Sequence, residues 1–213
     1  MSSVTLQKWG GLASWMLAMA YAVPSAIYLV GDLRSALGPL TYDLADFLYG
    51  PVWAVSLISS FLALRARIGS GASGRMSLAW TAAWVAAAAM ICVAFIRSAN
   101  RHYHLMHPEL HLESSETVLT VWATLVAGVI GVGFHFLGWS LLLLGSAGWS
   151  SRQLPGALAA LYLTVGAAAL FVYLQPELEG LAILLGVVAS VWQGFVLWQS
   201  KPVHAPAPAP LTG

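Results

Sequence analysis

Six long apolar segments dominate the sequence and constrain what it can fold into. They cover residues 9–31, 44–64, 77–96, 118–144, 156–174 and 181–199. Each is close to the ~20 residues that an α-helix needs to cross the hydrocarbon core of a bilayer. Because backbone polar groups in lipid must be satisfied within their own segment, such runs predict helices. The sequence therefore predicts an all-α, polytopic membrane protein with six transmembrane helices in an antiparallel bundle.

The composition excludes an ordinary soluble domain. Hydrophobic residues make up 59% of the chain and charged residues 8%, whereas soluble domains carry about 25% charged residues. The net charge is +1 and the basic residues are scattered, so the expected partner is the lipid bilayer and not nucleic acid. The single cysteine, Cys92, permits no intrachain disulfide. We expect one transmembrane domain, residues 1–200, followed by a Pro/Ala-rich disordered cytoplasmic tail, residues 201–213.

The charges between the segments predict the orientation of the chain. Threading the segments back and forth places all eight acidic residues on one side, together with three basic residues, Arg34, Arg97 and Arg101. Six basic residues fall on the other side: Lys8, Arg65, Arg67, Arg75, Arg152 and Lys201. Short loops rich in Lys and Arg stay in the cytoplasm. We therefore expect the N-terminus and the C-terminus to be cytoplasmic.

Four of the six histidines lie in the long loop predicted on the outer side. They are His102, His104, His107 and His111, with Glu109 and Glu113 nearby. His107 and His111 would share a face of a short helix, and the other two would share one side of an extended stretch. Imidazole and carboxylate groups bind divalent transition metals such as Zn²⁺, although this spacing matches no metal motif. There are two alternatives to a metal site. The loop is a solvated connector, or it is a pH-responsive segment, because histidine titrates near neutrality.

His135 is the one histidine within a predicted membrane segment. It lies four residues after Gly131 and three before Gly138, and these glycines recur with Gly145 every seven positions. A glycine face allows a neighbouring helix to approach closely, so we expect His135 to face the bundle and not lipid. An ionisable residue in a membrane is a candidate for function. The alternative is a neutral histidine that forms a hydrogen bond across helices.

Pro24 and Pro51 form a third feature. At 1.5 Å per residue, both lie roughly 10 Å below the outer surface. Each proline removes a backbone hydrogen bond and frees a carbonyl group, which is tolerated where water or another helix compensates. With Asp43, Asp46 and Tyr49 nearby, they would line an outward-facing polar pocket. The alternative is that Asp43 caps the second helix and Asp46 lies in its first turn, next to the positive end of the helix dipole.

Catalytic signatures are missing from the sequence. It contains no glycine-rich phosphate loop, no HExxH and no GxSxG. No second histidine lies at the depth of His135, so a haem held by two membrane histidines is disfavoured. We expect no catalytic residues and no cofactor, apart from the metal considered for the histidine loop.

One stretch carries a family pattern. A helix with Phe136, Gly138 and Gly145 ends in a small-residue loop, after which Arg152-Gln-Leu-Pro155-Gly156 leads into a Gly/Ala/Leu-rich helix. Over roughly residues 134–183 this pattern resembles a bacterial family of multi-pass membrane proteins of unknown function. The resemblance implies a location in the bacterial inner membrane and brings no catalytic residues with it.

Three classes of function are left open by these features. The first is a small-molecule or ion carrier with a polar cavity near the outer leaflet, for which a water-accessible cavity reaching Asp46 or His135 would speak. The second is a non-catalytic accessory or scaffold subunit of a larger membrane complex, which would show a broad apolar face and no internal cavity. The third is a membrane-embedded enzyme, which would require two or more of the polar groups to converge.

Overall fold

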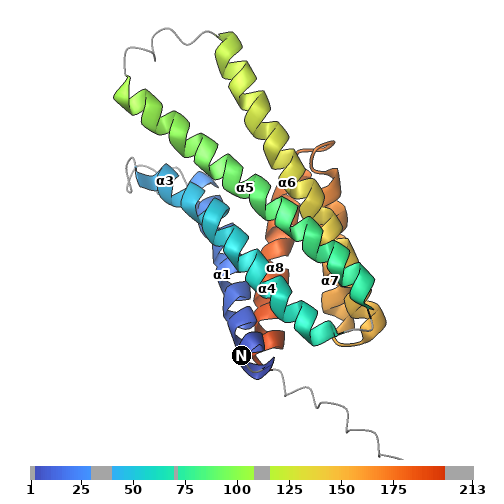
Figure 1. Ribbon diagram of the computed structural model, residues 1–213. Coiled ribbons are helices and arrows are strands. Elements are labelled where there is room, and N and C mark those ends of the chain that lie inside the picture. Colours follow the sequence, from blue (N-terminus) through green and yellow to red (C-terminus); the bar gives the residue numbers. More distant parts are fainter. Residues whose placement is uncertain (1–2, 30–39, 70–71, 108–115, 200–213) are drawn as a thin grey trace, which may run out of the picture.

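The computed structural model describes residues 3–29, 40–69, 72–107 and 116–199, and every regular element in these ranges is a helix. The elements are α1 (Ser3–Leu29), α3 (Leu40–Phe47), the π-helical turn η1 (Leu48–Val52), α4 (Trp53–Ile68), α5 (Ser73–Met106), α6 (Glu116–Ser151), α7 (Gly156–Phe171) and α8 (Leu178–Trp198). The segment α3–η1–α4 is continuous (Figure 1). The predicted tail, residues 201–213, lies outside the described residues.

Five stretches of the described helices are long and apolar enough to cross a membrane. They are Val4–Ile27, Thr41–Ile68, Gly74–Tyr103, Thr120–Ser151 and Leu178–Trp198. The predicted all-helical class is confirmed, and the length and composition of these helices are those of a membrane protein. The helix α7 is also apolar, but its 16 residues make it shorter than the other five.

The helix α5 continues well past the predicted segment 77–96 and has 34 residues. His102 and His104 lie in its last turns, so the prediction that they share one side of an extended stretch was wrong. On an α-helix two residues two positions apart point about 200° from each other. Arg97 and Arg101 stabilise these turns, because both side chains reach carboxylates on α3.

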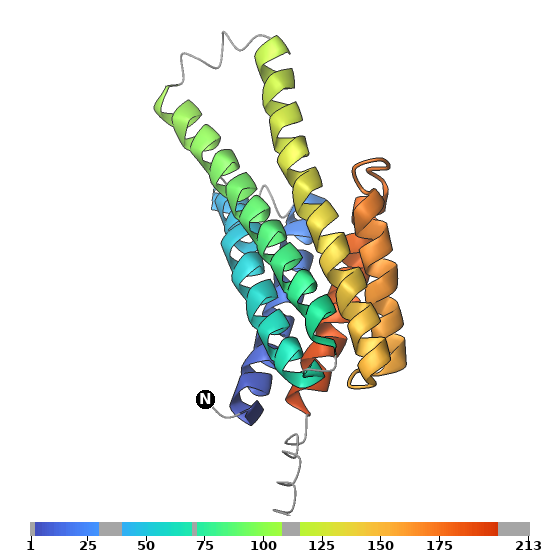
Figure 2. The same ribbon diagram turned by 45° about the vertical axis from the view of Figure 1, so that its right-hand side comes forward.

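The helices pack as a closed ring. Going around it, α1 packs on α4, followed by α5, α6, α7 and α8, and α8 packs back on α1 (Figures 1 and 2). We call one end of the ring the acidic end, because it carries the described acidic residues Asp43, Asp46, Glu116, Glu177 and Glu179. The opposite end, where the N-terminus and the end of α8 lie, is the basic end and carries Lys8, Arg65, Arg67, Arg75 and Arg152.

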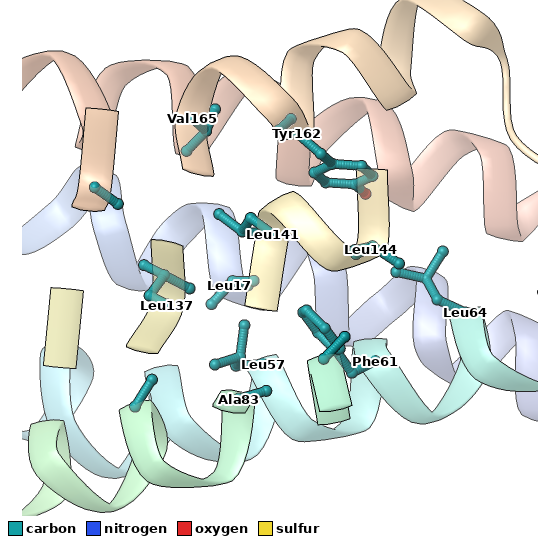
Figure 3. Close-up of a cluster of buried hydrophobic side chains, with 14 of the residues drawn as sticks. Leu17, Leu57, Phe61, Leu64, Ala83, Leu137, Leu141, Leu144, Tyr162 and Val165 are labelled. Atoms are coloured by element: carbon teal, nitrogen blue, oxygen red, sulfur yellow. The ribbon is translucent and has the colours of Figure 1, made fainter. Parts of the chain in front are cut away.

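Apolar side chains from around the ring fill its interior. Figure 3 shows Leu17 of α1, Leu57 and Phe61 of α4, Leu137 and Leu141 of α6, and Tyr162 and Val165 of α7 in one cluster. The helix α5 adds small side chains such as Ala83, which is fully buried. One core thus joins helices from the first and second halves of the chain.

Glycines bring α6 and α7 into backbone contact. A Cβ atom on Gly138 would lie 2.8 Å from the carbonyl oxygen of Gly166, and one on Gly166 would lie 2.9 Å from that of Gly138. Two helical turns further along α6, a Cβ atom on Gly145 would lie 2.8 Å from the carbonyl oxygen of Ala159. The glycines that recur every seven residues therefore lie on the face where a neighbouring helix approaches closely.

Candidate functional site

The site begins where the long segment α3–η1–α4 departs from α-helical geometry. Pro51 has no backbone N–H to donate, and the five residues around it, Leu48–Val52, form a π-helical turn. Such turns commonly occur at functional sites. The turn packs closely against α5: a Cβ atom on Gly50 would collide with the side chain of Ala94. The predicted irregularity at Pro51 is therefore present, within the stretch Thr41–Ile68, which is long and apolar enough to cross a membrane.

Three aromatic side chains meet at this turn. The Tyr21 ring of α1 lies 6.4 Å from the ring of Tyr49 and 5.8 Å from that of Trp53, in edge-to-face orientation. The Tyr49 hydroxyl is buried and has no hydrogen-bond partner within the described part of the chain, whereas the buried Trp53 indole N–H is directed toward the Tyr21 hydroxyl. A buried polar group without a partner costs about 1–3 kcal/mol. Such groups in a folded protein call for an explanation, and a ligand or water that binds there is one.

An ion-pair network lies directly above the aromatic cluster, on the side of the acidic end. The Asp46 side chain is 5% exposed and contacts two guanidinium groups of α5. Arg101 Nη1 lies 2.5 Å from Asp46 Oδ2, and Arg97 Nη1 lies 3.6 Å from Asp46 Oδ1. Arg101 also donates to Asp43 Oδ1 at 2.7 Å. Two arginines four residues apart on α5 thus hold both carboxylates of α3.

The position of the two aspartates corrects a sequence-based prediction. The helix α3 already begins at Leu40, so Asp43 lies in its first turn and Asp46 one turn later. The alternative in which Asp43 caps this helix and Asp46 lies in its first turn therefore does not hold. Both side chains instead extend sideways to α5, because charged pairs with arginine are stronger than a dipole interaction at a helix end.

Two further polar side chains of α5 lie near Asp43. The Ser98 hydroxyl donates to Asp43 Oδ1 at 3.5 Å, and His102 Nε2 lies 3.9 Å from the same oxygen. A serine–histidine–aspartate triad requires the serine hydroxyl to donate to the histidine. Here the hydroxyl is directed at the carboxylate, so the three residues do not form a triad.

Polar groups continue along the bundle axis below the aromatic cluster. Tyr162 donates to Gln193 Oε1, Gln193 Nε2 donates to Ser14 Oγ at 2.9 Å, and Ser14 donates to the Gly10 carbonyl oxygen at 2.7 Å. A cavity of about 20 Å³ lies beside this chain of hydrogen bonds, with Tyr21, Ser60, Tyr162, Ser190 and Gln193 among its lining residues. This volume holds about one water molecule. The sequence analysis missed these residues, although Gln193 is a polar residue within an apolar segment.

Glu179 lies at the edge of the same region and was also missed as a site residue. It is half-buried in the first turn of α8, and its carboxylate is within electrostatic range of Arg97 and Tyr49. The signal that could have identified it is an acidic residue next to a long apolar run, at the N-terminus of a predicted helix. Asp46, Tyr49, Arg97 and Glu179 thus lie at the acidic end on three separate segments, with Arg97 in contact with Asp46 and within electrostatic range of Glu179.

His135 lies apart from this cluster. It is half-buried on α6, and its ring is 6.5 Å from that of Tyr173 at the end of α7. Its Nε2 atom accepts a hydrogen bond from Trp139 Nε1 at 3.2 Å. His135 lines a groove between α6 and the connection from α7 to α8.

The histidine loop is only partly described. His102 lies near Asp43, and the His107 ring packs 4.7 Å from the ring of Tyr103. His111 and the side chain of His104 lie outside the described residues. Within the described residues, no group of three or more His, Cys, Asp or Glu side chains is placed to hold a metal ion. Metal binding by the complete loop stays a prediction.

Fold and site together define an α-helical bundle with five helices long and apolar enough to cross a membrane, and with charged and polar side chains inside one end of the bundle. Comparison with protein-family models, with curated proteins and with solved structures finds no match. The function is therefore argued from the site itself.

Proposed function

We propose that the protein is a carrier for a small polar molecule or ion in the bacterial inner membrane. The observation that carries this proposal is the Tyr49 hydroxyl, which is buried without a partner among the described residues, on a π-helical turn inside a stretch long and apolar enough to cross a membrane. Carriers commonly form their binding sites where a membrane helix is interrupted, because the freed backbone and side-chain groups can bind the solute. Here the interruption lies next to Asp46, Arg97 and Arg101.

The polar groups below the turn support the same function. They extend from Tyr49 and Tyr21 to Ser190 and Gln193 around the cavity on the bundle axis. That cavity has room for about one water molecule, so the bundle is closed around it. A carrier would open this path alternately toward each side of the membrane.

The two alternatives each have an observation in their favour. An accessory or scaffold subunit is favoured by the projecting ends of α5 and α6, which expose Leu105, Met106, Val118, Val121 and Leu125. A membrane enzyme is favoured by the convergence of polar side chains around Asp46. The carboxylates of that cluster are, however, held by arginines, and we therefore rank the carrier first.

Accessibility of the axial cavity tests the carrier proposal. After replacement of Cys92, a cysteine at Ser190, which is 5% exposed and lines the cavity, should react with a small charged thiol reagent in right-side-out and in inside-out vesicles. A cysteine at Val188 serves as a matched control, because it lies two residues away on the outer surface of α8. A thiol that faces lipid does not form the reactive thiolate and should stay unmodified. Lack of reaction at Ser190 from both sides would contradict a carrier and favour the accessory subunit.

We also propose that the bundle is antiparallel with six spans and that its acidic end faces outward. The short helix α7 is the sixth span, because it packs between α6 and α8 and is apolar. The excess of Lys and Arg at the basic end places that end in the cytoplasm.

Labelling in intact cells tests this orientation. After replacement of Cys92, a cysteine at Leu105 is expected to react with an impermeant maleimide, and a cysteine at Ala66 is expected to react only after the cells are opened. Both positions are exposed at opposite ends of the bundle. The reverse pattern would place the acidic end inside.

A further inference from the structure

A second hollow lies on the side of the bundle, away from the axis. It is a groove of about 770 Å³ between α6 and the connection from α7 to α8. Its floor on α6 is formed by small residues, and a Cβ atom on Gly128 would meet nothing within 4 Å. Figure 2 shows the N-terminal half of α6 rising above the α7–α8 connection, which leaves this side of α6 uncovered. The volume lies within the range of about 300–1,000 Å³ that small-molecule sites have.

The groove has one charged group among its described lining residues, the carboxylate of Glu179. This carboxylate forms no hydrogen bond or ion pair with the residues that the structure describes. Arg97 is within electrostatic range of it, but its guanidinium contacts Asp46. The His135 ring also lines the groove, and its Nε2 atom accepts a hydrogen bond from Trp139. The groove consequently presents a negative charge in an otherwise apolar hollow.

Aromatic rings contribute to the same groove. Phe136 and Tyr173 line the groove, and the His135 ring lies 5.9 Å and 6.5 Å from them. The negative face of an aromatic ring attracts a cation within about 6 Å of its centre. An apolar floor, aromatic walls and a single carboxylate are together complementary to a molecule with an apolar body and one positive charge.

We propose that this groove binds a lipophilic organic cation that enters from the membrane. An anion of the same size would be repelled by Glu179, and a neutral lipid chain would leave the half-buried carboxylate without a counter-charge in the groove. The site goes beyond the carrier function and does not depend on it, because binding in the groove requires no movement of the bundle.

Two ions of nearly equal size and opposite charge test the proposal. Binding of tetraphenylphosphonium and of tetraphenylborate to the purified full-length protein would be measured by equilibrium dialysis in a neutral detergent, with empty micelles as reference. We expect saturable binding of the cation and none of the anion. Glu179→Gln should weaken cation binding about tenfold or more, because it removes the opposing charge from a site of low dielectric. Tyr173→Leu should weaken it by about two- to fivefold through loss of the aromatic face.

Glu177→Gln is the matched control. Glu177 lies two residues away and is exposed, outside the groove, so its replacement should leave cation binding within about twofold, as expected for a screened surface charge. Thermal unfolding of each variant would verify that it is folded. Equal binding of both ions would overturn the proposal by showing that the groove is an apolar lipid site. Unchanged cation binding in folded Glu179→Gln would also overturn it. Neither result bears on the carrier function, which the accessibility of the axial cavity tests separately.

Discussion

Replacement of Asp46 by asparagine is expected to lower the free energy of unfolding by about 3 kcal/mol, because it removes the buried carboxylate that balances the charges of two arginines. The Asp46 side chain is 5% exposed and faces Arg97 and Arg101. Asparagine has nearly the same shape but no charge, so both guanidinium groups would lose their buried counter-charge. Equilibrium unfolding in mixed micelles, followed by circular dichroism, would measure the change.

Asp43→Asn is the control for this experiment. The Asp43 side chain is 35% exposed, and ion pairs that water can screen contribute roughly 1 kcal/mol or less. In the double variant Asp46→Asn with Arg101→Gln, the combined loss should be smaller than the sum of the two single losses, because the interaction between Asp46 and Arg101 is counted in both. Equal effects of the two single variants would show that the burial of Asp46 has no energetic consequence.

Gly138→Ala is expected to destabilise the protein by about 2 kcal/mol, although alanine normally favours a helix over glycine. The added Cβ atom would lie 2.8 Å from the carbonyl oxygen of Gly166 and 2.8 Å from the backbone nitrogen of Leu170. Backbone atoms cannot rotate away as a side chain can, so α6 and α7 must separate, and overpacking of this kind costs about 1–3 kcal/mol. The same unfolding assay would measure the effect.

Gly128→Ala on the same helix should have the opposite sign. A Cβ atom there meets nothing within 4 Å, so the variant should gain up to about 1 kcal/mol from helix propensity alone. Destabilisation of equal size at both positions would mean that the helix backbone, and not the contact with α7, determines the cost.

Glu179 connects the two proposed sites. It lines the groove between α6 and the α7–α8 connection, and its carboxylate lies within electrostatic range of Arg97 and Tyr49, which belong to the candidate carrier site. A cation bound in the groove would change the field at the Asp46 cluster through this residue. The two sites are therefore neighbours at the acidic end, although different helices form their walls.

Part of the candidate site could be predicted from the sequence because it depends on local chemistry. Pro51 lacks an N–H wherever it stands, so an irregular turn near it was foreseeable. Gly138 and Gly145 have no side chain, so their spacing predicted the face that contacts α7. Neither inference needed to know which helix would be the neighbour.

The partners of the charged residues could not be predicted in this way. Asp43 and Asp46 at the start of an apolar run have the sequence context of capping residues, and only the packing of α3 on α5 shows that they bind Arg97 and Arg101. The interaction spans more than fifty positions in the sequence. Hydropathy and helical periodicity describe one segment at a time and contain no information about such a pairing.

By itself, then, the sequence determined that the chain forms long apolar helices, because the need to satisfy backbone groups in lipid acts on each segment alone. It also determined where the acidic and basic groups lie along the chain, and hence which ends of the helices carry them. Only the tertiary structure decided that Arg97 contacts Asp46 within electrostatic range of Glu179, and that Gln193 joins Tyr162 and Ser14. The physical reason is that ring closure, with α8 packed on α1, brings together side chains whose distance in the sequence carries no signal of their contact.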